Sequence, residues 1–134
     1  YHLDWENLTY ISVLAALVGT PFAPVMDRRL VFLEEVGEAP YRVNRLMTQL
    51  VQGAGLPRAA GVMLGVFSRC DAPAGEASLT LAETLEDQLG ALPMPSGYGY
   101  SFGHIAHHFT IPLGIRARLD TEARTLTLLE PAVA

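Results

Sequence analysis

The chain has 134 residues, of which 50% are hydrophobic and 17% are charged, and it carries a formal net charge of −5. This length and composition are typical of a compact globular domain that buries a core without disulfides, and they exclude a disordered segment. The acidic balance argues against a nucleic-acid-binding protein, because such proteins need a basic surface to displace counterions from phosphates. We therefore expect one domain over residues 1–134 and no nucleic-acid partner.

Cysteine content and hydropathy indicate the compartment. The one cysteine, Cys70, has no partner for an intramolecular disulfide, which is typical of a reducing environment. No stretch approaches the ~20 apolar residues that span a bilayer. The apolar run Tyr10–Val18 is too short for a span, and it lacks the basic flank of a signal peptide. These features predict a cytoplasmic protein without a membrane partner.

The first half of the chain contains two amphipathic segments and two apolar runs. Apolar residues recur with the helical period of about 3.6 residues over Trp5–Val18 and Pro40–Gln52, which predicts two helices. Asp4 is the expected N-cap of the first helix. The continuous apolar runs Arg29–Leu33 and Ala59–Phe67 predict buried strands, and the second run is typical of a strand covered on both faces.

The second half alternates short elements with loops. Thr80–Glu83 has the capping-box pattern that starts a helix, and we expect that helix to end at Leu89. Met94–Tyr100 has strand-like aromatic residues interrupted by glycines. Ile115–Leu119 and Thr125–Leu129 alternate apolar and polar side chains across a turn, which predicts an antiparallel hairpin with one solvated face. The chain is therefore predicted to have a mixed α/β fold, with a small mixed sheet or barrel and about three helices.

An acidic pair follows the first predicted strand. Burying a carboxylate at this place costs several kcal/mol unless a partner satisfies it. Because neighbouring side chains of a strand point to opposite faces, we expect one of Glu34 and Glu35 to face the interior and the other to face solvent. Exposure of both acids at the strand end is the alternative.

Three histidines lie within five residues: His104, His107 and His108. Gly103 gives the backbone freedom to present His104 in a cleft, and imidazole is the side chain best suited to moving protons near neutral pH. A structural or surface histidine is the alternative. A metal site is disfavoured, because Pro112 argues against a helix that would align the imidazoles and no nearby cysteine or aspartate completes a ligand set. We expect no metal and no cofactor.

The sequence contains no evident nucleophile. None of its serines lies in a Gly-x-Ser-x-Gly turn, and Ser101 is a candidate only because it precedes His104 by three residues. Cys70 lies between Arg69 and Asp71 without a catalytic cysteine signature, so we interpret it as a structural or exposed thiol. The residues alone therefore predict only an acid–base site.

Seven short motifs follow one another in the order Asn7-Leu8-Thr9, Gly19-Thr20-Pro21, Val31–Glu38, Tyr41–Arg45, Gly65-Val66-Phe67, Phe102-Gly103-His104 and Thr110–Gly114. In this order they resemble the C-terminal domain of the LD-carboxypeptidase family, which includes muramoyltetrapeptide carboxypeptidases and microcin-immunity peptidases. The resemblance covers about residues 7–133 and implies a swivelling β/β/α domain. One departure is Trp5-Glu6, where the family usually has two glycines.

The resemblance implies that Glu34 and His104 belong to a Ser-His-Glu triad. His104 would deprotonate the serine and then protonate the leaving amine, while Glu34 would hold the imidazole tautomer. The serine and the oxyanion hole would belong to an N-terminal α/β domain that is absent from these 134 residues. The chain alone is therefore expected to be inert.

The substrate class that the resemblance implies is the L,D-peptide bond before the terminal D-amino acid of murein tetrapeptides, as in cell-wall recycling. Such a substrate has a free carboxylate, for which Arg42 and Arg45 are candidate anchors, although we favour structural carboxylates as their partners. The resemblance also implies a homodimer, and it assigns no role to His107 and His108. The alternatives are a non-catalytic binding or assembly domain of the same fold, and a peptidase that acts on aminoacyl-nucleotide conjugates.

Overall fold

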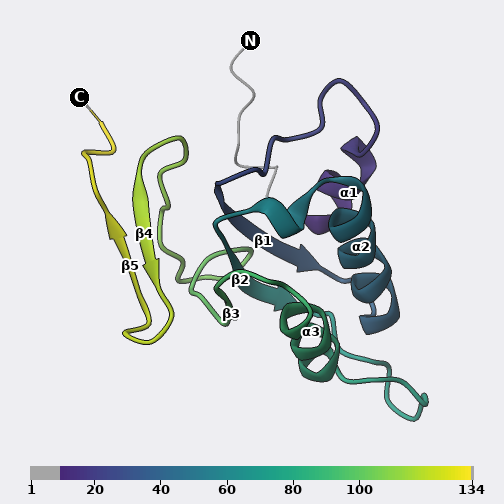
Figure 1. The fold of residues 1–134 in the computed structure, drawn as a ribbon. Helices are drawn as coiled ribbons and strands as arrows, with labels where there is room; N and C mark the ends of the chain where they lie inside the picture. The colour runs from purple at the N-terminus through teal and green to yellow at the C-terminus, as the bar shows by residue number, and fades with distance from the viewer. Residues whose placement is uncertain (1–9, 134) are drawn as a thin grey trace.

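The computed structural model describes residues 10–133, so the predicted N-cap Asp4 and the motif Asn7-Leu8-Thr9 lie outside the described residues. A three-stranded parallel sheet forms the centre of the fold (Figure 1). Its strands follow the order β1 (Leu30–Val36), β2 (Gly61–Ser68) and β3 (Ser96–Tyr98). The sheet and its helices confirm the predicted mixed α/β fold.

Three α-helices lie together on one side of this sheet in Figure 1: α1 (Ile11–Leu17), α2 (Pro40–Gly53) and α3 (Leu81–Gly90). A short 3-10 helix, η2 (Leu56–Arg58), leads into β2. The capping box is confirmed, because the Thr80 side chain accepts a hydrogen bond from the Glu83 N–H and the Glu83 carboxylate accepts one from the Thr80 N–H. These reciprocal bonds satisfy two backbone donors and fix the start of α3.

The first helix is shorter than the sequence predicts. It begins at Ile11, whereas the apolar period predicted helix from Trp5 onward. Tyr10 has an extended backbone instead, and it forms a parallel bridge with Glu34 of β1. Pairing with the edge of the sheet takes this residue out of the helix, which the local apolar period does not predict.

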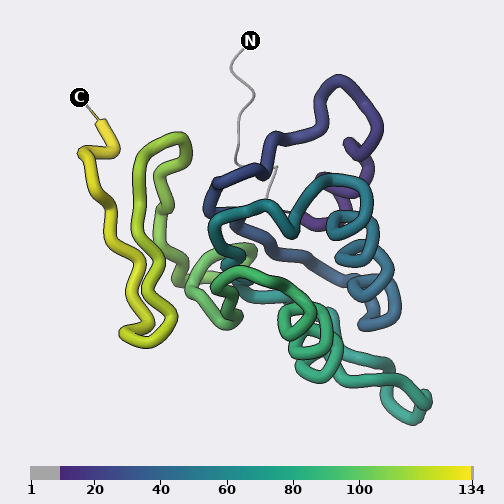
Figure 2. The backbone as a smooth tube through the Cα atoms, viewed as in Figure 1, coloured from purple at the N-terminus to yellow at the C-terminus, as the bar shows by residue number. Residues whose placement is uncertain are grey.

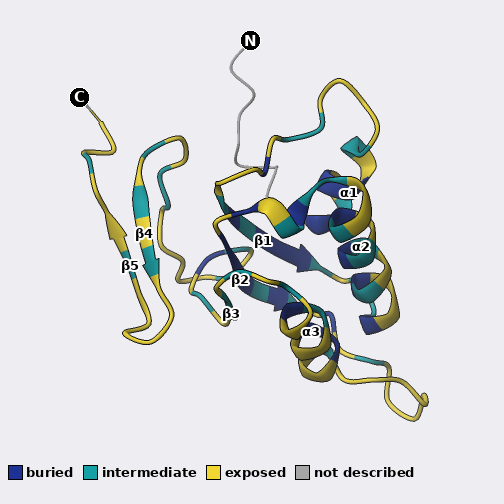
Figure 3. Cartoon of the chain, viewed as in Figure 1, coloured by how far each residue is buried: buried dark blue, intermediate teal, exposed yellow. Residues whose placement is uncertain are grey.

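The hydrophobic core fills the space between the helices and the sheet (Figure 3). Its fully buried side chains include Ile11, Leu33, Val43, Met47, Leu50, Val62 and Leu64. The strand β2 is buried along most of its length, as its continuous apolar pattern predicted. The backbone at Phe102 lies so close to β2 that a Cβ at Gly65 would be 2.5 Å from the carbonyl oxygen of Phe102. This contact brings the loop with His104 against the sheet.

The last two strands form a separate antiparallel hairpin of β4 (Ala117–Asp120) and β5 (Thr125–Leu128). Figure 2 shows the hairpin beside the sheet and away from the three helices. Side chains of β4 alternate between half-buried and exposed, which agrees with the predicted alternation. None of the helices in the part of the chain that the structure describes combines the length and the apolarity needed to cross a membrane.

Candidate active site

Both acids of the pair lie inside β1. The strand continues beyond its predicted end to Val36, and Glu34 and Glu35 are only 3% and 2% exposed. The prediction that one of them faces solvent is therefore wrong, and so is the alternative that both are exposed. The pairing of β1 with β2 shifts register between Leu33 and Glu35. Cover by α1 and by the loop with His104 buries both carboxylates.

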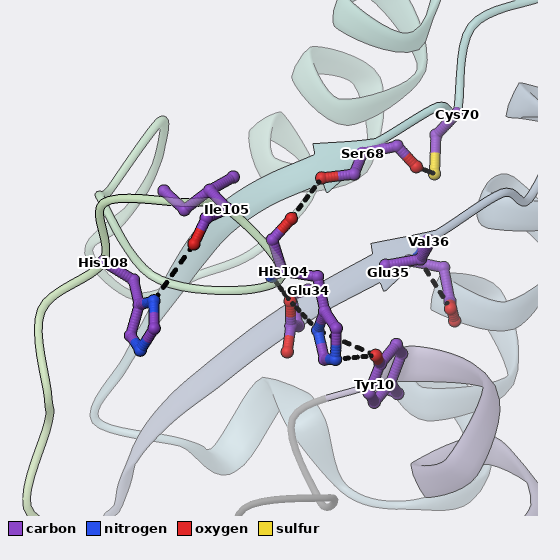
Figure 4. Close-up of polar contacts among 9 residues, drawn as sticks. All are labelled: Tyr10, Glu34, Glu35, Val36, Ser68, Cys70, His104, Ile105 and His108. Atoms are coloured by element: carbon purple, nitrogen blue, oxygen red, sulfur yellow. Dashed lines mark hydrogen bonds and ion pairs between the residues drawn. The ribbon is translucent and has the colours of Figure 1, made fainter.

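The two carboxylates have different partners (Figure 4). Oε2 of Glu34 accepts a hydrogen bond from the backbone N–H of His104 at 2.9 Å and lies 3.4 Å from the imidazole Nδ1. Oε2 of Glu35 accepts from the backbone N–H of Ser12 at 2.8 Å, and its Oε1 accepts from the N–H of Val36 at 2.9 Å. These bonds offset the cost of burying two carboxylates side by side in the sequence.

A buried aromatic residue anchors the loop that carries His104. Phe102 is 6% exposed, its ring meets Phe32 edge-on with centroids 5.6 Å apart, and its carbonyl accepts from the Val66 N–H at 3.0 Å. His104 follows two residues after Phe102, and its carbonyl accepts a hydrogen bond from the Ser68 hydroxyl at 3.2 Å. The His104 side chain itself is 57% exposed. The loop therefore presents an accessible imidazole beside a buried carboxylate.

Both the backbone conformation and the close packing at position 103 require a glycine. Its φ of +110° lies in a region that favours glycine. A Cβ at this position would clash with Oε2 of Glu34, because the two atoms would be closer than side chains approach one another. The hydrogen bond between this carboxylate and the next backbone N–H therefore depends on the absence of a side chain.

Replacing Gly103 with alanine should lower the free energy of unfolding by about 3 kcal/mol, because the substitution combines backbone strain with a steric clash. Chemical denaturation measures this change. Gly99→Ala is the matched control, since Gly99 has a φ of +85° but a Cβ added to it would meet no atom within 4 Å. The control should cost about 1 kcal/mol. Equal losses in the two variants would contradict the close approach of Gly103 to Glu34.

Tyr10 also contacts the His104 imidazole, and the sequence did not predict this contact. The hydroxyl oxygen of Tyr10 lies 2.6 Å from Nε2 and 2.7 Å from Nδ1 of His104, and the ring centroids are 4.9 Å apart. Burial, followed by the negative charges of Glu34 and Glu35, raises the pKa of the Tyr10 phenol. The phenol therefore stays protonated and can donate. The apolar period of the neighbouring residues predicted that this tyrosine lies in a helix, and no local sequence pattern predicted its contact with His104.

The other candidate residues do not join this pair. His107 and His108 are exposed, and Nδ1 of His108 lies 3.0 Å from the carbonyl oxygen of Ile105. Ser101 is exposed, and its carbonyl accepts a hydrogen bond from the Phe109 N–H. Within residues 10–133, no group of three or more His, Cys, Asp or Glu side chains is placed to hold a metal ion.

Cys70 and the two candidate arginines have structural surroundings. Cys70 is fully buried, its thiol donates to the carbonyl of Ser68 at 3.4 Å, and burial raises its pKa. A protonated, inaccessible thiol is a poor nucleophile. Arg42 on α2 pairs at 2.9 Å with Glu38, which precedes the helix, and Arg45 is exposed on the same helix. The expected pairing with a structural carboxylate is thus confirmed for Arg42.

A pocket of about 450 Å³ lies between the hairpin and the chain that follows β3. Its lining includes Met63, Tyr100, Phe102, Phe109, Arg124 and Leu126. It shares Phe102 with the loop that presents His104, but neither Glu34 nor His104 lines it. The pocket therefore lies next to the His104 loop, but it is a separate cavity from the site of Glu34 and His104.

The arrangement provides two parts of a nucleophile-activating site. A buried carboxylate beside Nδ1 favours the imidazole tautomer with its proton on that nitrogen, which leaves Nε2 as the base. Among residues 10–133, Tyr10 supplies the hydroxyl within hydrogen-bond distance of the His104 ring. No serine in this part of the chain makes such a contact with the ring, so a serine nucleophile would have to come from elsewhere.

Comparison with known proteins defines a class of peptidases. A family model described as the LD-carboxypeptidase C-terminal domain matches residues 9–119. A Synechocystis protein assigned as a carboxypeptidase is 39% identical over 89% of this chain and 40% of its own length. The murein tetrapeptide carboxypeptidase of Pseudomonas aeruginosa is 29% identical over 85% of this chain and 36% of its own length. The chain belongs to the LD-carboxypeptidase family, and it corresponds to the C-terminal domain of that family.

Solved structures agree with this assignment. The muramoyltetrapeptide carboxypeptidase from Oxalobacter formigenes matches with a TM-score of 0.77 and 30% identity, over 89% of this chain and 41% of that protein. The wild-type microcin C7 self-immunity protein matches with a TM-score of 0.77 and 19% identity, over 93% of this chain and 37% of that protein, and it shows a shared fold. The chain thus spans about two fifths of the length of these proteins.

Proposed function

We propose that this chain is the C-terminal part of a serine carboxypeptidase that cleaves the L,D-peptide bond of murein tetrapeptides and releases the terminal D-amino acid. The observation that carries this proposal is the contact of the buried Glu34 carboxylate with both the backbone N–H and the imidazole Nδ1 of His104. Membership in a carboxypeptidase family and the murein peptide names of its relatives support the reaction class.

In the proposed mechanism, His104 moves the proton and Glu34 holds the base. Nε2 of His104 accepts the serine proton as the serine oxygen attacks the scissile carbonyl, and the imidazolium then gives this proton to the leaving amine. Water hydrolyses the acyl-enzyme with the same imidazole as base. Glu34 stabilises the imidazolium, and its bond to the backbone of His104 keeps the carboxylate oriented throughout.

The proposal takes the nucleophile and the oxyanion hole from outside these 134 residues. The relatives are more than twice as long as this chain, which leaves room for an N-terminal α/β domain that carries the serine. The exposed imidazole of His104 is accessible to a group from such a domain. In this proposal the chain alone is inert, and the complete enzyme is a cytoplasmic homodimer.

The test is an assay of the protein as its gene encodes it on murein tetrapeptide, with the released amino acid and the remaining tripeptide measured by mass spectrometry. We expect release of the terminal D-amino acid, and no release from a control tetrapeptide with an L-amino acid at that position. An aminoacyl-nucleotide conjugate forms a third arm. Cleavage of the conjugate alone would favour the alternative peptidase, and cleavage of neither substrate would favour a binding or assembly domain.

A further inference from the structure

Glu35 is a second buried acid that the Glu34–His104 pair does not use. Its side chain is 2% exposed, and both of its oxygens accept hydrogen bonds from backbone N–H groups. One of these donors is Ser12, the second residue of α1, where backbone N–H groups have no partner within the helix. The carboxylate of Glu35 therefore ties the start of α1 to β1.

The start of α1 also places Tyr10. Tyr10 immediately precedes the helix, and its backbone pairs in parallel with Glu34 in β1. Its side chain reaches His104, and Figure 4 shows Tyr10 and Glu34 approaching the imidazole from different sides. Of the two neighbouring acids of β1, Glu34 therefore contacts His104 directly, and Glu35 holds the start of the helix that follows Tyr10.

We propose that Tyr10 is a positioning residue for His104, and that Glu35 holds Tyr10 in place through the start of α1. This inference rests on the proposed function, because it assigns roles in the same site. Glu34 lies 3.4 Å from Nδ1, which is long for a hydrogen bond, and more than half of the imidazole is exposed. A ring held by this contact alone is free to rotate.

The phenol supplies the closer contact. Its oxygen is about equally distant from the two ring nitrogens, so it lies against the Nδ1–Cε1–Nε2 side of the ring and restricts ring rotation. Packing of the two rings at a centroid distance of 4.9 Å adds to this restraint. A side chain locked by its supporting contacts is more precisely placed for proton transfer than a free one.

Tyr10→Phe tests the hydroxyl in the protein as its gene encodes it. On murein tetrapeptide we expect kcat to fall about tenfold while KM changes less than about twofold, because the base is misplaced and substrate contacts are not. Tyr41→Phe makes the same change on an exposed tyrosine of α2 and should leave both constants unaltered. An unchanged or increased kcat in Tyr10→Phe would overturn the inference, since an increase would mean that the phenol obstructs the imidazole.

A second readout does not depend on activity. NMR relaxation of the His104 Cε1–H bond should show an ordered ring in the wild type, with a high order parameter, and a lower order parameter in Tyr10→Phe as ring motion is released. If the wild type cleaves no murein tetrapeptide but these order parameters differ as expected, the proposed function fails and the inference about Tyr10 stands. Identical order parameters in the two proteins would overturn the inference alone.

A double-mutant cycle tests Glu35. Glu35→Gln keeps the size of the side chain and removes its charge, and it should lower kcat severalfold with the same change in the order parameter of the His104 ring. Because both residues act as one unit, the double variant with Tyr10→Phe should be no slower than Tyr10→Phe alone. If the losses of kcat in the two single variants multiplied in the double variant, the proposed role of Glu35 would be wrong.

The controls separate position from folding. Glu38→Gln removes a charge from the exposed pair with Arg42 and should change neither kcat nor the ring order parameter. If Glu35→Gln does not fold, Glu35→Asp takes its place, because aspartate keeps the charge and shortens the reach to Ser12. Loss of thermal stability without any change in the ring order parameter, in either variant, would assign Glu35 a purely structural role.

Discussion

Replacing His104 with alanine in the protein as its gene encodes it should lower kcat/KM on murein tetrapeptide by about a thousandfold or more. In the proposed mechanism the substitution removes the group that takes the serine proton, and neither His107 nor His108 replaces it, because both are exposed and Nδ1 of His108 lies against the carbonyl oxygen of Ile105. Steady-state release of the D-amino acid measures the loss.

The fold should survive this substitution, since the His104 side chain is more than half exposed and its backbone bonds to Glu34 and Ser68 remain. His108→Ala is the matched control, and it should keep a rate close to that of the wild type. A His104→Ala protein that retains a near-normal rate would remove His104 from the proposed mechanism.

Two substitutions of Glu34 should separate the catalytic role proposed for it from its structural role. Glu34→Gln keeps an acceptor for the His104 N–H and loses the negative charge, so kcat should fall by about a thousandfold or more with little loss of stability. Glu34→Ala also leaves a buried backbone donor without this acceptor, and it should lower the free energy of unfolding by a further ~2 kcal/mol.

Kinetics and chemical denaturation on the same preparations give both quantities. The comparison is informative because the two variants share the loss of charge and differ in the hydrogen bond. If Glu34→Gln retained activity, the charge would be dispensable and the triad would be the wrong description. If Glu34→Ala were as stable as Glu34→Gln, the bond to the loop would contribute nothing to the fold.

Local patterns predicted the elements that local physics determines. The helices over 40–53 and 81–90 follow from apolar period, proline at a first turn and a capping box, which act within a few residues. The strand β2 follows from a continuous apolar run. Motif order pointed to Glu34 and His104, and the structure brings their side chains to 3.4 Å although they are 70 positions apart.

Features that depend on tertiary contacts could not be predicted in this way. Parallel pairing with β2, as between Val36 and Ser68, extends β1 past the two acids. Alternation of side chains predicted that one of the two acids faces solvent, but α1 covers Glu35 and the loop with His104 covers Glu34. Tyr10 lies within an apolar run, and its contact with the imidazole depends on its tertiary pairing with Glu34, which a local pattern does not encode.

The anchoring of the His104 loop has a consequence for protein engineering. Contacts with the sheet are dense at Phe102, Gly103 and His104, whereas the residues from 106 to 110 are exposed. Exposed loop residues tolerate replacement and changes of length better than anchored ones. Residues 106–110 are therefore a suitable segment for sequence libraries, because diversity introduced there would leave the His104 imidazole where it is.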